Sequence, residues 1–358
     1  MERFGFVGLP NAGKSSLYNA LTGGGALAAP YAFATTDPNV GVAKVFDRRL
    51  EALAEMSASK KVVPASVQFT DIGGLVEGAS QGEGLGNKFL AGIREVDAIV
   101  YVLRAFRDDD VPGPSDPLEH LRIVELELTF ADLETVEKQL DKRRKAAKGD
   151  RSLLDEVEAA EAALEALERG EPLYRSSLSD AHRELLRPWF LLTNKPVLAV
   201  VNVDEASLGR EDELARPVVA ELGDLAPVFA ACVQLEAEAA QLDPEDRAEM
   251  LDAYDLGEGA LPRFIQAAYH ALGLRTFLTT GEAESRAWTF REGSTAPECA
   301  GRIHTDFQQG FIRAETIRWD RLLEIGSWAK ARELGAIRSE GKDYVVADGD
   351  VIEFRFNK

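Results

Sequence analysis

The sequence predicts an α/β protein with a mostly parallel sheet, an inserted antiparallel helical hairpin and a small α+β domain towards its C-terminal end. Short apolar runs alternate with helical patterns, as expected for parallel strands covered by helices on both faces. Residues 118–192 interrupt this alternation with two amphipathic helical patterns. From residue 276 onward, short alternating runs and turn glycines indicate a β-rich domain.

The composition limits the possible classes of protein. The 358 residues exceed a usual single domain, and the apolar fraction of 45% is ordinary for a globular protein. The formal net charge of −20 argues against a mainly basic nucleic-acid binder, so any RNA contact must come from a local patch. We expect neither a membrane span nor a signal peptide, and therefore a cytoplasmic protein. Cys232 and Cys299 are interpreted as reduced thiols, with a regulatory disulfide as the alternative.

A phosphate loop follows the first expected strand. Gly8-Leu-Pro-Asn-Ala-Gly-Lys-Ser15 fits G-x-x-x-x-G-K-[ST] and lies between an apolar run and a helical pattern. Gly8 and Gly13 let the backbone turn so that its N–H groups point at phosphate oxygens. Lys14 adds a positive charge for the outer phosphates, and the Ser15 hydroxyl can ligate Mg²⁺. A chance glycine turn is the alternative, which the match at every fixed position disfavours.

Further strands are expected at residues 40–45, 66–71, 98–103, 197–202 and 227–231. Before the first of these lies Tyr31-Ala-Phe-Ala-Thr-Thr-Asp-Pro-Asn39. A Thr-Thr-Asp-Pro string alone usually forms a turn. Because a phosphate loop precedes it, we predict that the Thr35 hydroxyl meets Mg²⁺ and the γ-phosphate.

The strand at 66–71 ends in a carboxylate followed by glycines. Asp71 is predicted to hold Mg²⁺ through water, and the Gly74 N–H to contact the γ-phosphate; a helix-capping Asp is the alternative. Lys14, Thr35 and Gly74 are therefore the expected catalytic residues. Leu75 occupies the place where many GTPases have the glutamine that orients water, so another group must position the water.

Residues 78–87 hold four glycines in ten positions. Such a segment rearranges at little cost and is costly to order, which predicts a switch.

The helical patterns within 118–192 predict an antiparallel hairpin. Its tip is expected at Lys142-Arg-Arg-Lys-Ala-Ala-Lys-Gly-Asp-Arg151, with Gly149 as the break. In an acidic protein, this basic tip is a candidate contact for an RNA phosphate backbone. An ordinary solvated helix end is the alternative.

The strand at 197–202 leads into a motif that would recognise the base. Nucleotide switches usually have Asn-Lys-x-Asp here, and this chain has Asn202-Val203-Asp204-Glu205. Losing the Asp side chain that accepts guanine's two N–H donors removes the main preference for guanine, while Asn202 can still bond the purine N7 edge. Ala231, within Ala230-Ala-Cys232, fits a small-residue loop beside the base. A capped strand end is the alternative.

In the C-terminal region we expect strands at 287–290, 344–346 and 351–356 and a helix at 297–307. Its Arg and Lys residues suit either RNA or a protein partner.

Together, these motifs resemble the Obg-like ATPases, YchF subfamily. The resemblance rests on the phosphate loop with Asn11, on Tyr-x-Phe-x-Thr-x-[DE]-Pro-Asn and on Asp-Ile-x-Gly-Leu-Val-x-Gly-Ala-Ser. Residues 301–315 and 340–344 resemble that family's TGS domain, a small ubiquitin-like α+β fold. The resemblance implies a P-loop G domain in two parts, a hairpin and a TGS domain, at residues 1–120 with 191–275, 121–190 and 276–358.

The resemblance also implies function. It implies Mg²⁺-dependent hydrolysis of ATP in preference to GTP and association with the ribosome. We expect the tip and the TGS domain to make the ribosome contact. The expected nucleotide-binding residues are Asn11, Ala12, Gly13, Lys14, Ser15, Ser16, Asn202, Val203, Glu205 and Ala231, of which the resemblance implies Asn11 to Ser16, Asn202 and Glu205. The expected metal ligands are Ser15, Thr35 and Asp71, of which the resemblance implies Ser15 and Thr35. Asn11 further suggests K⁺ beside the phosphates.

The chain departs from its relatives at three places. Gly73 stands where relatives often have Ala, and Ala34 replaces a common cysteine, which removes any thiol switch there. The loop 107–117 lacks a histidine that some relatives carry.

Two further interpretations remain open: a conventional GTPase of translation or ribosome assembly, and a binding protein in which nucleotide only gates partner choice. A monomer is expected.

Overall fold

The computed structural model describes residues 2–22, 40–72, 85–107 and 114–357. By compactness the chain separates into two units, one of Met1–Ala43 with Gln68–Phe264 and one of Lys44–Val67 with Ile265–Lys358. The four-part division expected from the sequence stays a prediction. Over the described ranges, no helix is both long and apolar enough to cross a membrane.

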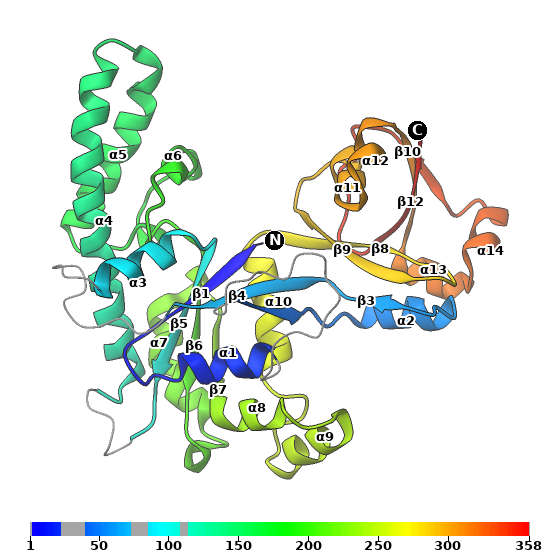
Figure 1. Ribbon diagram of the computed structural model, residues 1–358, viewed down its shortest axis with the longest axis horizontal. Coiled ribbons are helices and arrows are strands. Elements are labelled where there is room, and N and C mark those ends of the chain that lie inside the picture. The colour runs from blue at the N-terminus through cyan, green and yellow to red at the C-terminus, as the bar shows by residue number, and fades with distance from the viewer. Residues whose placement is uncertain (1, 23–39, 73–84, 108–113, 358) are drawn as a thin grey trace. The chain divides into compact units, whose positions relative to one another are not determined.

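The first unit is built on a six-stranded sheet in the order β2-β4-β1-β5-β6-β7 (Figure 1). Its strands are β1 (Arg3–Val7), β2 (Val40–Lys44), β4 (Ser66–Asp71), β5 (Ala98–Arg104), β6 (Val197–Asn202) and β7 (Val228–Ala231). β1 pairs in parallel with β4 and β5, and β5, β6 and β7 continue in parallel. The predicted parallel sheet is confirmed, and the expected strands coincide with observed ones to within one residue.

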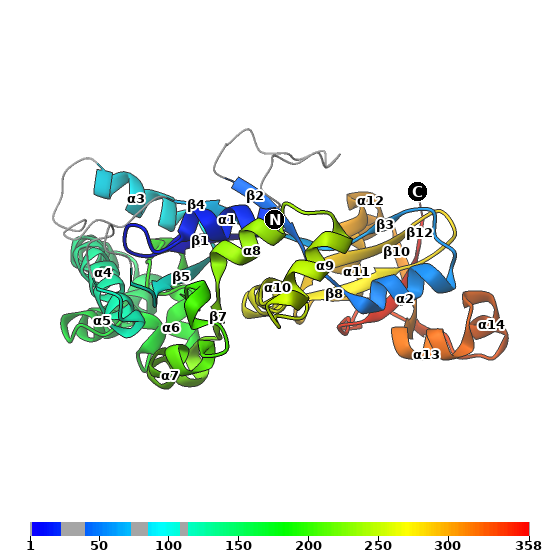
Figure 2. The ribbon, with the colours of Figure 1, turned by 90° about the horizontal axis from the view of Figure 1, so that it is seen from below.

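The helices of this unit are α1 (Lys14–Thr22), α3 (Leu85–Arg94), α4 (Pro117–Ala147), α5 (Leu154–Glu168), α6 (Asp180–Leu185), α7 (Glu211–Leu222), α8 (Val233–Ala239), α9 (Pro244–Ala253) and α10 (Leu261–Ala271), which continues into the second unit. Short 3-10 turns lie at Arg151–Leu153, Leu173–Arg175, Arg187–Trp189, Glu205–Ser207 and Gly223–Leu225. α1 and α7 lie on opposite sides of the sheet (Figure 2).

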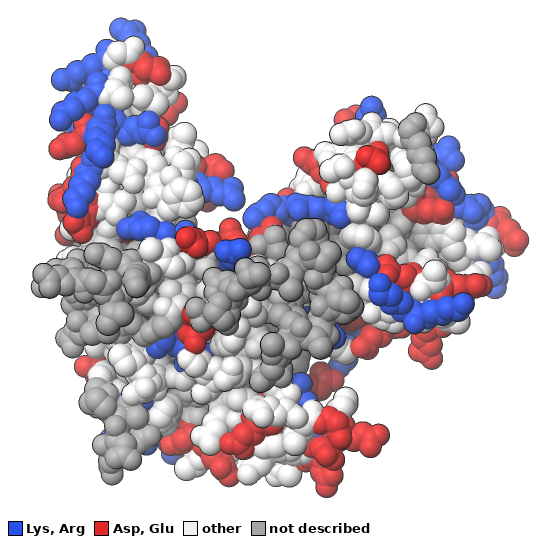
Figure 3. Space-filling model, viewed as in Figure 1, with Lys and Arg blue, Asp and Glu red and all other residues white. Residues whose placement is uncertain are grey.

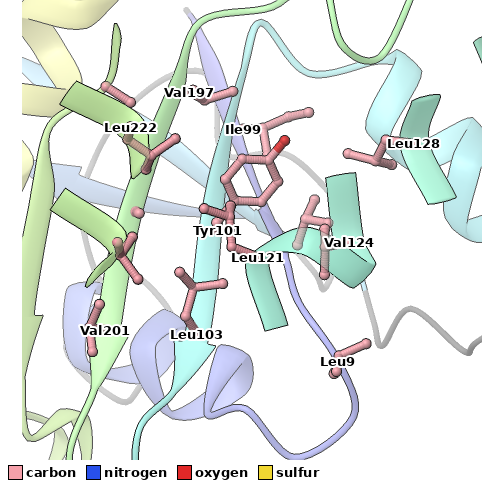
Figure 4. Packing of buried hydrophobic residues seen from close by; sticks show 14 of the residues in the cluster. Leu9, Ile99, Tyr101, Leu103, Leu121, Val124, Leu128, Val197, Val201 and Leu222 are labelled. Atoms are coloured by element: carbon pink, nitrogen blue, oxygen red, sulfur yellow. The ribbon is translucent and has the colours of Figure 1, made fainter. Parts of the chain in front are cut away.

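The core of the first unit lies between the sheet and α4. All seven residues of β5 are buried, which explains its unbroken apolar run. Tyr101 and Leu103 of β5 point towards Leu121 and Val124 of α4 (Figure 4). These contacts fix where the hairpin leaves the sheet.

The predicted antiparallel hairpin is confirmed (Figure 1). The Asp116 carboxylate caps the start of α4 by accepting a hydrogen bond from the Leu118 N–H at 2.9 Å. The first half of α4 packs on the sheet, and its second half packs through Val136 and Leu140 against buried alanines of α5. One continuous helix therefore joins the sheet to the hairpin tip.

The second unit contains a six-stranded sheet in the order β11-β10-β12-β8-β9-β3. Its strands are β3 (Val62–Val63), β8 (Leu274–Thr279), β9 (Ser285–Arg291), β10 (Phe311–Arg318), β11 (Arg338–Glu340) and β12 (Asp350–Phe356). Its helices are α2 (Arg48–Met56), α11 (Ala296–Ile303), α12 (Thr305–Gln309), α13 (Trp319–Ile325) and α14 (Trp328–Glu333). The predicted small α+β fold is confirmed.

The structure corrects two details of this unit. The helix expected at 297–307 is broken at His304, whose extended backbone (φ −162°, ψ 146°) ends α11 and begins α12. The strand expected at 344–346 is only a single bridge between Thr295 and Val345. Residues 44–67 also pack here: β3 pairs with β9, and Arg49 forms an ion pair with Asp348 at 2.6 Å.

Candidate functional site

The phosphate loop joins β1 to α1 at the carboxyl end of the parallel strands, where such sheets bind ligands. Asn11 and Gly13 have left-handed backbones, with φ of 57° and 99°. A Cβ on Gly8 would lie 2.4 Å from the Val102 carbonyl oxygen of β5, so only glycine fits this close approach. The sequence therefore builds a tight turn whose backbone is available to an anion.

Lys14 lies across this loop. Its Nζ donates hydrogen bonds to the carbonyls of Gly8 at 3.1 Å and Leu9 at 2.7 Å, and the residue is 6% exposed. Burial lowers the pKa of Lys14 to about 8, although the charge of Asp71 opposes the shift. A bound phosphate would supply the counter-charge that burial removes from this ammonium.

Ser15 and Asp71 lie together at the other side of the loop, where Asp71 brings a negative charge. The Ser15 hydroxyl donates to Asp71 Oδ2 at 2.7 Å, and Asp71 is the last residue of β4. A hydroxyl and a carboxylate are the hard oxygen ligands that suit Mg²⁺ in phosphate sites. Within the described ranges, no group of three His, Cys, Asp or Glu side chains is placed to hold a metal. The donor set fits Mg²⁺ shared with substrate phosphates. Thr35, Gly74 and Leu75 lie outside the described residues.

A pocket of about 220 Å³ joins the phosphate loop to the predicted base motif. It is lined by Asn11, Gly13, Ser16, Phe106, Asn202, Val203, Asp204, Glu205, Cys232, Gln234, Leu235 and Glu238. Residues that are far apart in the sequence are thus brought to one site. Ala231 lines a second pocket, of about 460 Å³, and its neighbour Cys232 lines both.

The Asn202 side chain connects the phosphate loop to the start of α8 by hydrogen bonds. Its Nδ2 donates to the Ala12 carbonyl at 3.0 Å, and its Oδ1 accepts from the Val233 N–H at 3.2 Å. A Cβ on Gly13 would lie 2.2 Å from this Nδ2. An amide has two N–H donors, so one remains for a ligand.

Several pocket residues were not anticipated from the sequence. Phe106 follows the end of β5 by two residues, a position that strand-end reasoning would single out. Gln234, Leu235 and Glu238 lie on α8, where no sequence signal marks them. Tyr254, the residue that follows α9, interacts with the Glu205 carboxylate, and this interaction raises the pKa of Tyr254.

A phosphate loop with Lys14 and Ser15 at the carboxyl end of a parallel sheet defines a P-loop nucleoside triphosphate hydrolase. The chain is 48% identical to "Ribosome-binding ATPase YchF" of Bacillus subtilis (strain 168) over 99% of its length and 98% of that protein, and 44% identical to the protein of the same name from Haemophilus influenzae, with the same coverage. The chain belongs to the YchF family.

Two family models and one solved structure support the same family membership. The family described as 50S ribosome-binding GTPase (MMR_HSR1) matches residues 3–168, and YchF-GTPase_C, described as a protein of unknown function (DUF933), matches residues 274–357. The YchF GTPase of Schizosaccharomyces pombe superposes with a TM-score of 0.88 at 33% identity, covering 99% of this chain and 97% of that one. The resemblance found from the motifs is confirmed.

The lowered pKa of Lys14 predicts a pH-dependent affinity. The pKa is about 8 in the folded chain and 10.5 for an unperturbed lysine side chain, so the free energy of unfolding should rise with pH between these values. Phosphate favours the protonated form. Nucleotide binding at pH 9 should therefore take up a proton, and affinity should fall by up to about tenfold per pH unit above 8.

Calorimetry at pH 9 in two buffers of different ionisation heat measures this uptake. Lys195→Gln is the matched control, because the pKa of Lys195 is also lowered to about 8 by burial but its Nζ bonds carbonyls of α3 and residue 96. Equal heats in the two buffers would contradict the prediction.

The two cysteines should differ in their response to nucleotide. Both are free and buried; burial raises the pKa of Cys232 and raises that of Cys299 to about 12. Maleimide should label both slowly. Nucleotide at ten times its dissociation constant should slow labelling of Cys232 about tenfold, because it occupies the pocket that Cys232 lines. Mass spectrometry with Cys232→Ser as the control checks this, and an unchanged rate at Cys232 would show that nucleotide binds elsewhere.

Proposed function

We propose that this protein hydrolyses ATP in preference to GTP with Mg²⁺, and that its nucleotide state sets its association with the ribosome. The observation that carries the proposal is the single pocket shared by the phosphate loop and the Asn202–Glu205 motif. The relatives' names, which describe ribosome-binding ATPases, support it. A cytoplasmic monomer without membrane contact remains part of the proposal.

The base end of the pocket supports the preference for adenine. Three carboxylates line it, from Asp204, Glu205 and Glu238, and none of its described lining residues is Lys or Arg. Guanine recognition needs a carboxylate placed to accept both of its Watson–Crick N–H donors. Glu205 is one methylene longer than that Asp, and its carboxylate interacts with Tyr254. The carboxylate that would bind guanine thus interacts with a side chain of this protein instead.

Apolar side chains supply the surface for the purine ring. Val203 and Leu235 are buried in the pocket wall, and the Phe106 ring is partly exposed beside them. An aromatic ring next to a flat base contributes stacking that does not depend on the base's hydrogen-bond pattern. Phe106 therefore adds affinity, and the polar motif adds selectivity.

Hydrolysis would take place at the phosphate end of the site. Bound Mg²⁺ would supply charge neutralisation on the phosphates, held by Ser15 and Thr35 directly and by Asp71 through water. Lys14 binds the outer phosphates and stabilises their developing charge, and the Gly74 N–H binds the γ-phosphate. Asn11, on its left-handed backbone, is proposed to help hold K⁺. An apolar Leu75 cannot orient water, so this task falls to another group.

A conventional GTPase is the second candidate, because both matching families and the S. pombe structure carry GTPase in their names. Titration with ATP and GTP under the same Mg²⁺ concentration decides between the two. Tighter binding of GTP would overturn the proposed preference.

A shorter and unrestrained acid at position 205 should restore guanine binding. In Glu205→Asp with Tyr254→Phe, the carboxylate has the conventional length and no tyrosine partner. We expect the ratio of GTP to ATP affinity to rise about tenfold or more. Val203, at 2% exposure, is left unchanged, since a buried lysine would unfold the site rather than test it.

The matched control is Glu213→Asp, an exposed pair partner of Arg210 outside the pocket. Fluorescent-nucleotide competition measures both affinities. A ratio equal to that of the wild type would contradict the role given to Glu205.

The hairpin tip is proposed to contact ribosomal RNA, together with the C-terminal TGS domain. Lys and Arg gather at the free end of the hairpin (Figure 3). Arg143 pairs with Glu156 at 3.0 Å and Arg144 with Glu161 at 2.8 Å, so these two cations hold α4 to α5. Among the described residues, the remaining tip cations make no ion pair: Lys142, Lys145, Lys148 and Arg151. These four are the candidates for phosphate contacts.

Replacing these four cations by Gln should weaken ribosome binding mainly at low salt. The slope of log affinity against log salt should become shallower by about 3. Gln at the exposed Arg122, Arg187, Arg210 and Arg216 is the control, because none of these residues lies at the tip or in the C-terminal domain and the change in net charge is the same. Pelleting with ribosomes over a salt series measures the slope, and equal slopes in both variants would argue against an RNA contact at the tip.

A further inference from the structure

The hairpin is attached to α3 at its root. Arg94, the last residue of α3, donates from one guanidinium nitrogen to Thr135 Oγ1 of α4 at 2.9 Å. Its other terminal nitrogen donates to the Phe190 carbonyl at 3.0 Å, in the segment that returns from the hairpin. Arg94 thus contacts both the outgoing and the returning chain.

A second contact fixes the same end of α3. Lys195 Nζ donates to the carbonyls of Ile93 at 2.9 Å and Arg94 at 2.8 Å, and also to the Val96 carbonyl. A cation at a helix C-terminus satisfies the unpaired carbonyls and suits the helix dipole. The segment that carries Lys195 leads from the hairpin into β6, so it too belongs to the hairpin root.

The two sides of the root form one piece. Asp132 of α4 is fully buried and accepts hydrogen bonds from the N–H groups of Leu192 and Thr193, at 2.8 and 2.7 Å, and from the Thr193 hydroxyl at 2.7 Å. A buried carboxylate that accepts three hydrogen bonds resists separation of α4 from the segment that returns from the hairpin. Displacement of α3 would therefore move α4 and the returning segment together.

The other side of α3 meets the phosphate site. Ile72 directly follows Asp71, whose carboxylate bonds Ser15 of the phosphate loop. A Cβ on Gly92 of α3 would lie 2.6 Å from Ile72 Cγ2, and a Cβ on Gly5 of β1 would lie 2.4 Å from Ile72 Cδ1. Ile72 is thus wedged between β1 and α3, and packed side chains transmit such displacements because cores compress little.

We propose that α3 transmits the state of the phosphate site to the hairpin, with Ile72 against Gly92 as the input contact and Arg94 on Thr135 and Phe190 as the output contact. This inference rests on the proposed function and assigns its regulation to named residues. A change at Asp71 on nucleotide binding shifts Ile72, Ile72 shifts α3, and Arg94 turns the hairpin root.

The test follows the hairpin tip with spin labels. The labels are placed at Gly149→Cys on the tip and Arg216→Cys on α7, which are both exposed. The distance between the labels should change between ADP and a non-hydrolysable ATP analogue in the otherwise unaltered chain. The change should be clearly reduced in Arg94→Ala, where Lys195 still holds the end of α3, and reduced less in Thr135→Val.

Thr129→Val is the matched control on the same helix. Thr129 Oγ1 donates to the Glu125 carbonyl at 2.7 Å as Thr135 Oγ1 donates to that of Ala131 at 2.8 Å, and only Thr135 also accepts from Arg94. Nucleotide affinities of all three variants should stay within about twofold of the unaltered chain, because none touches the pocket.

An undiminished change in Arg94→Ala overturns the inference, as does an unaltered chain that binds both nucleotides without any change at the tip. Neither result contradicts the proposed ATP hydrolysis. Failure of the unaltered chain to bind ATP in the parallel titration would overturn the proposed function and this inference with it.

Discussion

The side-chain amide of Asn202 is the contact on which the nucleotide site depends. It joins the Ala12 carbonyl in the phosphate loop to the Val233 N–H at the start of α8. These segments follow different strands, and strand pairing alone does not fix the spacing of the loops beyond the strand ends. Gly13 must lack a side chain because a Cβ would meet the Asn202 nitrogen at 2.2 Å. The glycine of the phosphate motif therefore serves the fit to Asn202 as well as the turn.

Charge in the site is compensated on two sides. The chain carries a net charge of −20, yet repulsion of a triphosphate by distant carboxylates is screened over a Debye length of about 8 Å. On one side, Lys14 is held by two loop carbonyls that cannot neutralise it. On the other, Asp71 adds a negative charge next to Ser15, which a divalent cation would balance. The phosphates are thus placed between a desolvated ammonium and a metal site.

The sequence predicted those parts of the site whose residues have fixed spacing. Lys14, Ser15 and Asp71 lie in motifs or at the end of an apolar strand, so their meeting follows from a parallel sheet. The role of Tyr254 could not be predicted, because its interaction with Glu205 depends on where α9 packs. The packing of residues 44–67 in the second unit could not be predicted for the same reason. Arg49 meets Asp348, 299 positions away, and no local pattern records such a contact.

The helix break at His304 is a smaller example of a feature that the sequence pattern could not predict. The apolar pattern continues through it, but its ring Nδ1 accepts the Asp306 N–H and starts a new helix. Side-chain bonds to the backbone can therefore divide a helix that periodicity alone would leave whole.

The hairpin's construction decides how far a motion at its root can reach. On the α5 side the contact is made mainly by alanines, which bury little area, and Arg143 and Arg144 of α4 add ion pairs to α5. α4 is continuous over 31 residues, without a proline after its first turn. At a rise of about 1.5 Å per residue, its last helical residue lies about 18 Å along the axis from Thr135. A break in this stretch would absorb a rotation made at Arg94, whereas a continuous helix carries it to the cations at the tip.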